Sequence, residues 1–140
     1  MKGVGDMTEK VFEACDKALP EAMGFLEETL EEYGCPLKTV MRISVCFEEI
    51  FVNIAHYAYP EGTGEVTVCI NEDEDEITVT FIDTGIEFDP TEKADPDISL
   101  SADSREIGGL GIFMVKKSMD KVKYERIDGK NIFSMTKAKG

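Results

Sequence analysis

One segment constrains the fold more than any other: residues 37–59 carry apolar side chains on almost every side of a helix. Pro60 and Gly62 follow and end the helix. A helix that is apolar around most of its circumference is buried inside a domain. The sequence therefore predicts a long central helix with other elements packed around it. Its apolar residues include Val40, Met41, Ile43, Val45, Phe47, Ile50, Phe51, Val52 and Ile54.

The polar residues of this helix fall on one narrow stripe, formed by Arg42, Glu49, Asn53 and His56. Glu49 and Asn53 are four residues apart and share a face. A carboxylate can take a proton from a hydroxyl or a water, and a carboxamide oxygen suits Mg²⁺. The alternative for this pair alone is a solvated polar stripe. We expect His56 to pack or hydrogen-bond locally, not to act as a nucleophile.

Composition narrows the class of protein. A chain of 140 residues predicts one domain with a single core. Its net charge of -14 argues against DNA, RNA or an anionic membrane as a partner, and it fits either simple solubility or a basic partner. No stretch approaches the roughly 20 apolar residues of a membrane span. Four scattered cysteines and one histidine argue against a zinc site, and without a secretion signal we expect a cytoplasmic protein with reduced thiols.

The remaining elements alternate between strand and helix patterns. They predict an α+β fold, a two-layer sandwich of about three helices over a mixed, mostly antiparallel sheet. Residues 87–107 lack periodicity, which is typical of a functional loop such as a lid. The expected strands are 10–14, 65–70, 76–82, 121–126 and 130–137, and the other expected helices are 20–32 and 112–119.

Two further motifs suggest a nucleotide site. Asp83-Thr84-Gly85 follows a strand, where the carboxylate can accept a hydrogen bond from an exocyclic amino group such as that of adenine. The glycine allows close approach to a flat ring. The alternative is an ordinary turn.

The second motif, Gly108-Gly109-Leu110-Gly111, precedes an apolar helix. Glycines allow backbone N–H groups to converge on phosphate oxygens at the positive end of a helix. A flexible hinge is the alternative, and the sequence is not that of a P-loop. Arg105 lies just upstream and could bind a phosphate through two donors.

Together and in this order, these segments resemble the GHKL ATPase superfamily, and within it the stand-alone bacterial anti-sigma factor serine kinases. Glu49 and Asn53 match the family's N-box, and Asp83 and Gly85 match its Asp-x-Gly box. The run Gly109-Leu110-Gly111-Ile112 matches its second glycine box. The similarity extends from about residue 8 to the end of the chain.

The resemblance implies a Bergerat-type ATP-binding fold over residues 1–140, with ATP or ADP and Mg²⁺ as ligands. It implies a general base at Glu49, a Mg²⁺ ligand at Asn53 and an adenine-recognising carboxylate at Asp83. Gly85 would line the base pocket, and residues 91–107 would form the ATP lid. The phosphates would lie against Gly109, Leu110 and Gly111, with Arg105 as the further phosphate ligand that its position suggests.

The resemblance also implies a protein-serine kinase that acts on an anti-anti-sigma protein and binds a sigma factor. It implies a homodimer by analogy, and no direct contact with nucleic acid or membrane. Two alternatives remain open: a nucleotide-gated binding module without kinase activity, and the catalytic half of a split histidine kinase.

The chain departs from its relatives at three places. Tyr57 stands where many relatives have a histidine, and Glu87 stands where small residues are common. Lys130 and Asn131 follow Gly129, where relatives often have Gly-Thr. This last change leaves open whether Ser134 or Thr136 supplies a hydroxyl near the adenine.

Overall fold

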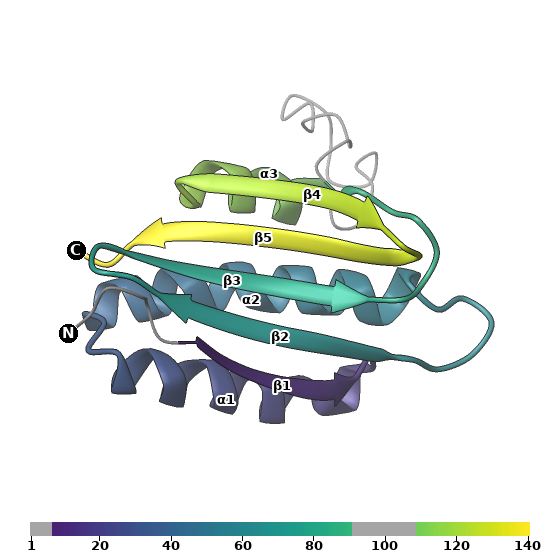
Figure 1. Cartoon of the computed structure of the whole chain (residues 1–140), viewed down its shortest axis with the longest axis horizontal. Helices are drawn as coiled ribbons and strands as arrows, with labels where there is room; N and C mark the ends of the chain where they lie inside the picture. Colours follow the sequence, from purple (N-terminus) through teal and green to yellow (C-terminus); the bar gives the residue numbers. More distant parts are fainter. Residues whose placement is uncertain (1–6, 91–108) are drawn as a thin grey trace.

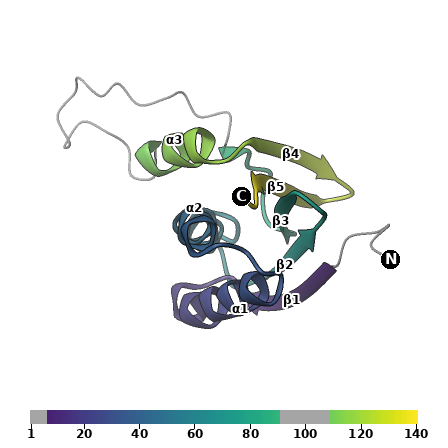
Figure 2. The same cartoon turned by 90° about the vertical axis from the view of Figure 1, so that its left-hand side faces the viewer.

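The computed structural model describes residues 7–90 and 109–140. Three helices cover one face of a five-stranded sheet (Figures 1 and 2). None of the helices in these two ranges is long and apolar enough to cross a lipid bilayer. In chain order the elements are β1 (Met7–Glu13), the 3-10 turn η1 (Asp16–Ala18), α1 (Leu19–Glu32), α2 (Leu37–Tyr57), β2 (Glu65–Glu72), β3 (Glu76–Asp83), α3 (Gly109–Ser118), β4 (Lys121–Ile127) and β5 (Lys130–Ala138).

The strands lie in the order β1-β2-β3-β5-β4, and every neighbouring pair is antiparallel. The expected α+β sandwich is confirmed. The parallel pairing that a mixed sheet would contain does not occur among these five strands. The register of β3 and β5 places Asp83 opposite Asn131, although 48 residues separate them in the chain.

The helix α2 lies between α1 and α3, and its inner face packs on the sheet. Phe47 and Phe51 on this face are fully buried, and the ring of Phe47 lies 5.1 Å from that of Phe81 in β3. Burying aromatic rings of this size is the main source of hydrophobic stabilisation in a core. The predicted central helix is confirmed.

The expectation that α2 is buried on almost every side is wrong on its outer side. Leu37, Met41 and Val45 are 72%, 60% and 52% exposed. Neither neighbouring helix covers them, because α1 and α3 pack against the flanks of α2 and leave its outward side open.

The start of α3 differs from the prediction. The helix begins at Gly109, three residues earlier than expected, so that Gly109 to Gly111 form its first turn and not a preceding loop. Glycine has a low intrinsic helix propensity, which is why the pattern favoured a later start.

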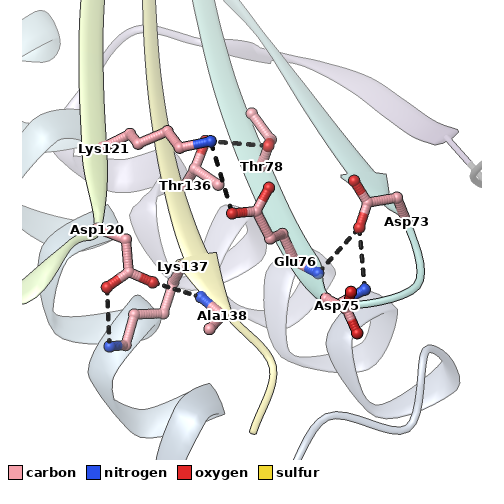
Figure 3. Close-up of polar contacts among 9 residues, drawn as sticks. All are labelled: Asp73, Asp75, Glu76, Thr78, Asp120, Lys121, Thr136, Lys137 and Ala138. Atoms are coloured by element: carbon pink, nitrogen blue, oxygen red, sulfur yellow. Dashed lines mark hydrogen bonds and ion pairs between the residues drawn. The ribbon is translucent and has the colours of Figure 1, made fainter.

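Carboxylates fix the backbone at one end of the sheet (Figure 3). The side chain of Asp73 accepts hydrogen bonds of 3.0 Å from the backbone N–H groups of Asp75 and Glu76, which hold its pKa below the usual value. Asp120 accepts a 2.7 Å bond from the backbone N–H of Ala138, and this bond likewise lowers the pKa of its carboxyl. These carboxylates thus anchor the turn between β2 and β3 and the end of β5.

Candidate functional site

The side chains of Glu49 and Asn53 lie together on α2. The Asn53 side chain is buried, and its Nδ2 donates to the backbone oxygen of Glu49 at 2.7 Å and to the carboxylate Oε2 of Glu49 at 3.0 Å. With both amide hydrogens committed to Glu49, the remaining oxygen Oδ1 is the atom that can bind a cation. The pair therefore combines a half-buried carboxylate with an oriented oxygen ligand.

Gly111 brings the first turn of α3 against this pair. A Cβ atom at Gly111 would lie 2.0 Å from Cδ of Glu49 and 2.2 Å from its Oε1. The Glu49 carboxylate thus occupies the space that any side chain at residue 111 would need. The first turn of a helix leaves N–H groups without intrahelical partners and carries partial positive charge. The candidate base therefore lies beside a helix N-terminus of the kind that can bind an anion, which also includes the backbone of Gly109 and Leu110.

Asp83 ends β3 with its side chain buried. Its Oδ1 accepts hydrogen bonds of 2.9 Å from the backbone N–H of Gly85 and from Nδ2 of Asn131. The other oxygen, Oδ2, is then the one that can accept a hydrogen bond from a ligand.

A close contact with the end of α2 requires a glycine at residue 85. A Cβ atom there would lie 2.2 Å from the backbone oxygen of Ala58 and 2.6 Å from its carbonyl carbon. The neighbouring Ile86 donates its N–H to the same oxygen at 2.9 Å. The turn after β3 is therefore held directly on the backbone of α2, where no side chain fits.

Asn131, which the sequence marks only as a departure from the relatives, has a central place in the site. Besides its bond to Asp83, its Nδ2 donates to the backbone oxygen of Ile86 at 2.7 Å. Its Oδ1 accepts from the hydroxyl of Tyr124 and from Nη1 of Arg126, the latter at 3.1 Å. Burial raises the pKa of the Tyr124 hydroxyl, which keeps it a donor at neutral pH. Asn131 thus connects β5, the turn after β3, and Asp83.

Neither Ser134 nor Thr136 supplies a hydroxyl to this network. Their hydroxyls pair with Thr80 at 3.1 Å and with Thr78 at 3.0 Å. Successive residues of a strand point to opposite faces, so both lie on the face opposite Asn131. The period of the strand alone would therefore have indicated that Ser134 and Thr136 do not share a face with Asn131.

A pocket lies between α2 and the β3–β5 end of the sheet, and Asn53, Asp83 and Asn131 all line it. Its cavity of about 20 Å³ has room for a single water molecule. Its polar lining is of a kind that can hydrogen-bond a base, but the cavity among the described residues is smaller than an adenine. The lining residues are Ile50, Asn53, Ile54, Ala58, Asp83, Phe88, Pro90, Tyr124, Asn131 and Phe133.

The other residues singled out from the sequence lie either outside the described residues or at the edge of the site. Arg105 and the expected lid at 91–107 lie outside the described residues. His56 is exposed and its Nε2 lies 2.9 Å from Oδ1 of Asp16, which agrees with a local hydrogen-bonding role. The ring of Tyr57 lies 6.0 Å from that of Phe88, at the rim of the pocket.

Comparison with known proteins agrees with this geometry. Residues 12–137 match the family described as the histidine kinase-like ATPase domain. The chain belongs to this family. Its matching region includes Glu49, Asn53, Asp83 and Asn131.

Several curated proteins of similar sequence bear kinase or anti-sigma names. The serine/threonine-protein kinase BtrW of Bordetella bronchiseptica is 26% identical over 95 residues, 67% of each chain. The serine-protein kinase RsbW of Bacillus cereus is 29% identical over 119 residues, covering 82% of this chain and 68% of the relative. The anti-sigma F factor of Clostridium acetobutylicum is 28% identical over 114 residues, covering 81% and 75%.

A solved structure has the same fold. It contains the RsbU and RsbW domains of a Mycobacterium tuberculosis protein, and it superposes with a TM-score of 0.63 at 15% identity. The alignment covers 94% of this chain, which spans about a third (32%) of the length of the solved chain.

Proposed function

We propose that this histidine kinase-like domain binds ATP and ADP with Mg²⁺, and transfers the γ-phosphoryl group of ATP to a serine of an anti-anti-sigma partner. We also propose that it binds a sigma factor and acts in the cytoplasm. By analogy with the family that it resembles, we expect it to form a homodimer. The names of the relatives from three genera support this class of function. Its activity on a particular serine is our own inference.

The observation that carries the proposal is the meeting of Glu49, Asn53 and Gly111 at the start of α3. Asn53 would bind Mg²⁺ through Oδ1, and the backbone N–H groups of the first turn of α3 would bind phosphate oxygens. The bound cation would neutralise phosphate charge as the phosphoryl group transfers. Asp83 would recognise the adenine amino group through Oδ2, and Arg105 stays a predicted phosphate ligand.

Glu49 would act as the general base. The partner's serine oxygen forms a bond to the γ-phosphorus as the bond from that phosphorus to the β,γ-bridging oxygen breaks, and ADP leaves. The proton of the serine hydroxyl passes to the Glu49 carboxylate. The hydrogen bond from Asn53 holds that carboxylate in one orientation, which is what a positioned base requires.

The test is a comparison of Glu49→Gln with Glu48→Gln. Glutamine keeps the shape of the side chain but cannot accept the proton. We expect Glu49→Gln to bind ADP as the unaltered protein does, and to transfer phosphate about 10²–10⁴-fold more slowly to a co-encoded anti-anti-sigma protein. Glu48 is exposed and about 100° around the helix, so its variant should be nearly neutral. Equal losses in the two variants would refute the assignment of the base.

A further inference from the structure

An apolar ridge runs along the outer side of α2. Leu37, Met41 and Val45 are spaced four residues apart, so they follow one side of the helix over about 12 Å. They are 72%, 60% and 52% exposed. Single exposed apolar residues are ordinary on a protein surface, but a continuous row of this kind marks an interaction site.

A hollow lies on one side of the ridge, toward α1. Its volume is about 610 Å³, and its far wall carries Glu27 and Glu31. The surface on the other side of the ridge is shallow and open, and Lys38 and Arg42 border the ridge there. The surface is therefore apolar in the middle, acidic along α1 and basic along the opposite edge of α2.

One buried polar atom also lies in the hollow toward α1. Ser44 is 8% exposed and lines this hollow, and its Oγ has no hydrogen-bond partner within the described residues. A buried hydroxyl without a partner costs stability, and such atoms are rare in native proteins. Ser44 therefore marks a place in the wall of this hollow where the described residues leave a polar atom unsatisfied.

The charged groups beside the ridge are available to a partner. Within the described parts of the chain, no ion pair engages Glu27, Glu31, Lys38 or Arg42. We propose that the ridge is the docking surface for an amphipathic helix of a partner protein. That helix has an apolar stripe, Lys or Arg on the side that faces α1, and Asp or Glu on the side that faces Arg42.

A partner of this kind fits better than a second copy of the chain. If two copies met at the ridge, each would bring a net charge of -14 and the repulsion would weaken that contact, so the homodimer proposed above would use another surface. A helix with basic residues is attracted to the same surface. Complementary charges at the edge of an interface mainly increase the association rate and fix the orientation.

The position of the ridge deepens the proposed function, on which this part of the inference rests. Val45 precedes Glu49 by four residues on the same helix, about 6 Å along its axis. A helix bound on the ridge therefore lies about one turn from the candidate base. Docking there would bring a partner's serine close to the site.

The test uses two synthetic helical peptides that share one leucine stripe and differ only in the sides that carry Lys and Glu. Each is titrated into the ¹⁵N-labelled full chain without nucleotide. We expect the peptide with Lys toward α1 to shift the amide signals of Ser44 and of the ridge residues. The charge-swapped peptide should bind several-fold more weakly, with a difference that shrinks at high salt.

Met41→Glu should weaken the first peptide at least tenfold. Met7→Glu is the matched control, because Met7 is similarly exposed (57%) but lies on β1, and it should change nothing. No binding, or equal weakening in both variants, would overturn the proposal. So would a concentration-dependent dimer in sedimentation that Met41→Glu abolishes, because the occupant would then be a second copy. ADP affinity, measured on the same samples, tests the nucleotide site separately.

Discussion

Replacing Asn131 with Asp tests the network that holds Asp83. The change removes the donor that lies 2.9 Å from Oδ1 of Asp83 and 2.7 Å from the backbone oxygen of Ile86. It also brings a second carboxylate against the first in a buried site, since Asp83 and Asn131 are only 4% and 5% exposed.

The magnitude follows from these contacts. A hydrogen bond to a charged group is worth about 1.5–3 kcal/mol, and one between neutral groups about 0.5–1.5 kcal/mol. Two like charges about 4 Å apart repel by roughly 4 kcal/mol at an effective dielectric constant of 20. The donor groups of Arg126 and Tyr124 offset part of this repulsion. We therefore expect Asn131→Asp to lower the free energy of unfolding by about 2–5 kcal/mol at pH 8.

The pH dependence gives the sharper test. Keeping two adjacent carboxylates ionised costs electrostatic free energy, so one of them takes up a proton as the pH falls. The loss of stability should therefore be smaller at pH 5 than at pH 8, as measured by urea unfolding, and ADP affinity should follow the same trend. Asn131→Ala, which removes the donor but adds no charge, should lose stability with a smaller trend of the same sign.

Asn71→Asp is the matched control, because it adds the same charge at an exposed position of β2. It should change the free energy of unfolding by less than about 0.5 kcal/mol. If Asn131→Asp behaves like Asn71→Asp, or if its loss is the same at pH 5 and pH 8, then Asn131 does not hold Asp83 in the way described.

Two other predictions concern the backbone and the acid stability of the sheet. Gly85→Ala should destabilise the fold by about 1–3 kcal/mol and abolish ADP binding in calorimetry, because its Cβ would lie 2.2 Å from the rigid backbone oxygen of Ala58. Gly24→Ala, in an open position of α1, should instead be neutral or stabilise by about 0.5–1 kcal/mol, and equal effects of the two would contradict the steric argument. Backbone hydrogen bonds hold the pKa of Asp73 in the folded protein below its usual value of 3.8, so its contribution to stability is present above that value and is lost as the pH falls through the lowered pKa. Asp73→Asn should therefore reduce stability in urea at pH 7 and bring the variant closer to the unaltered protein at pH 2–3, whereas a constant difference would contradict the role of its charge.

The strands were predictable because their residues alternate or are β-branched. Glu65–Glu72 and Glu76–Asp83 differ from the predicted strands by no more than two residues at either end. The pattern also identified the central helix, since its spacing reports which residues share a side. It could not report whether another element covers that side, and so the exposure of Leu37 and Met41 was missed.

The candidate site was predictable where a motif is local. Glu49 and Asn53 are one helical turn apart, and their proximity follows from the helix alone. The partner of Asp83 depends on the register between β3 and β5, which joins residues 48 positions apart, so the role of Asn131 follows only from the structure. The contact of Gly111 with Glu49 likewise depends on how α3 packs against α2.

Calorimetric titration of the unaltered protein with ADP, in the presence and absence of Mg²⁺, tests the central claim of a nucleotide site most directly. The arrangement of Asn53, Asp83 and Gly111 predicts binding of ADP that strengthens with Mg²⁺. Asn53→Ala should remove the Mg²⁺-dependent part, and GDP should bind more weakly than ADP. A folded protein that binds no adenine nucleotide under either condition would contradict the account.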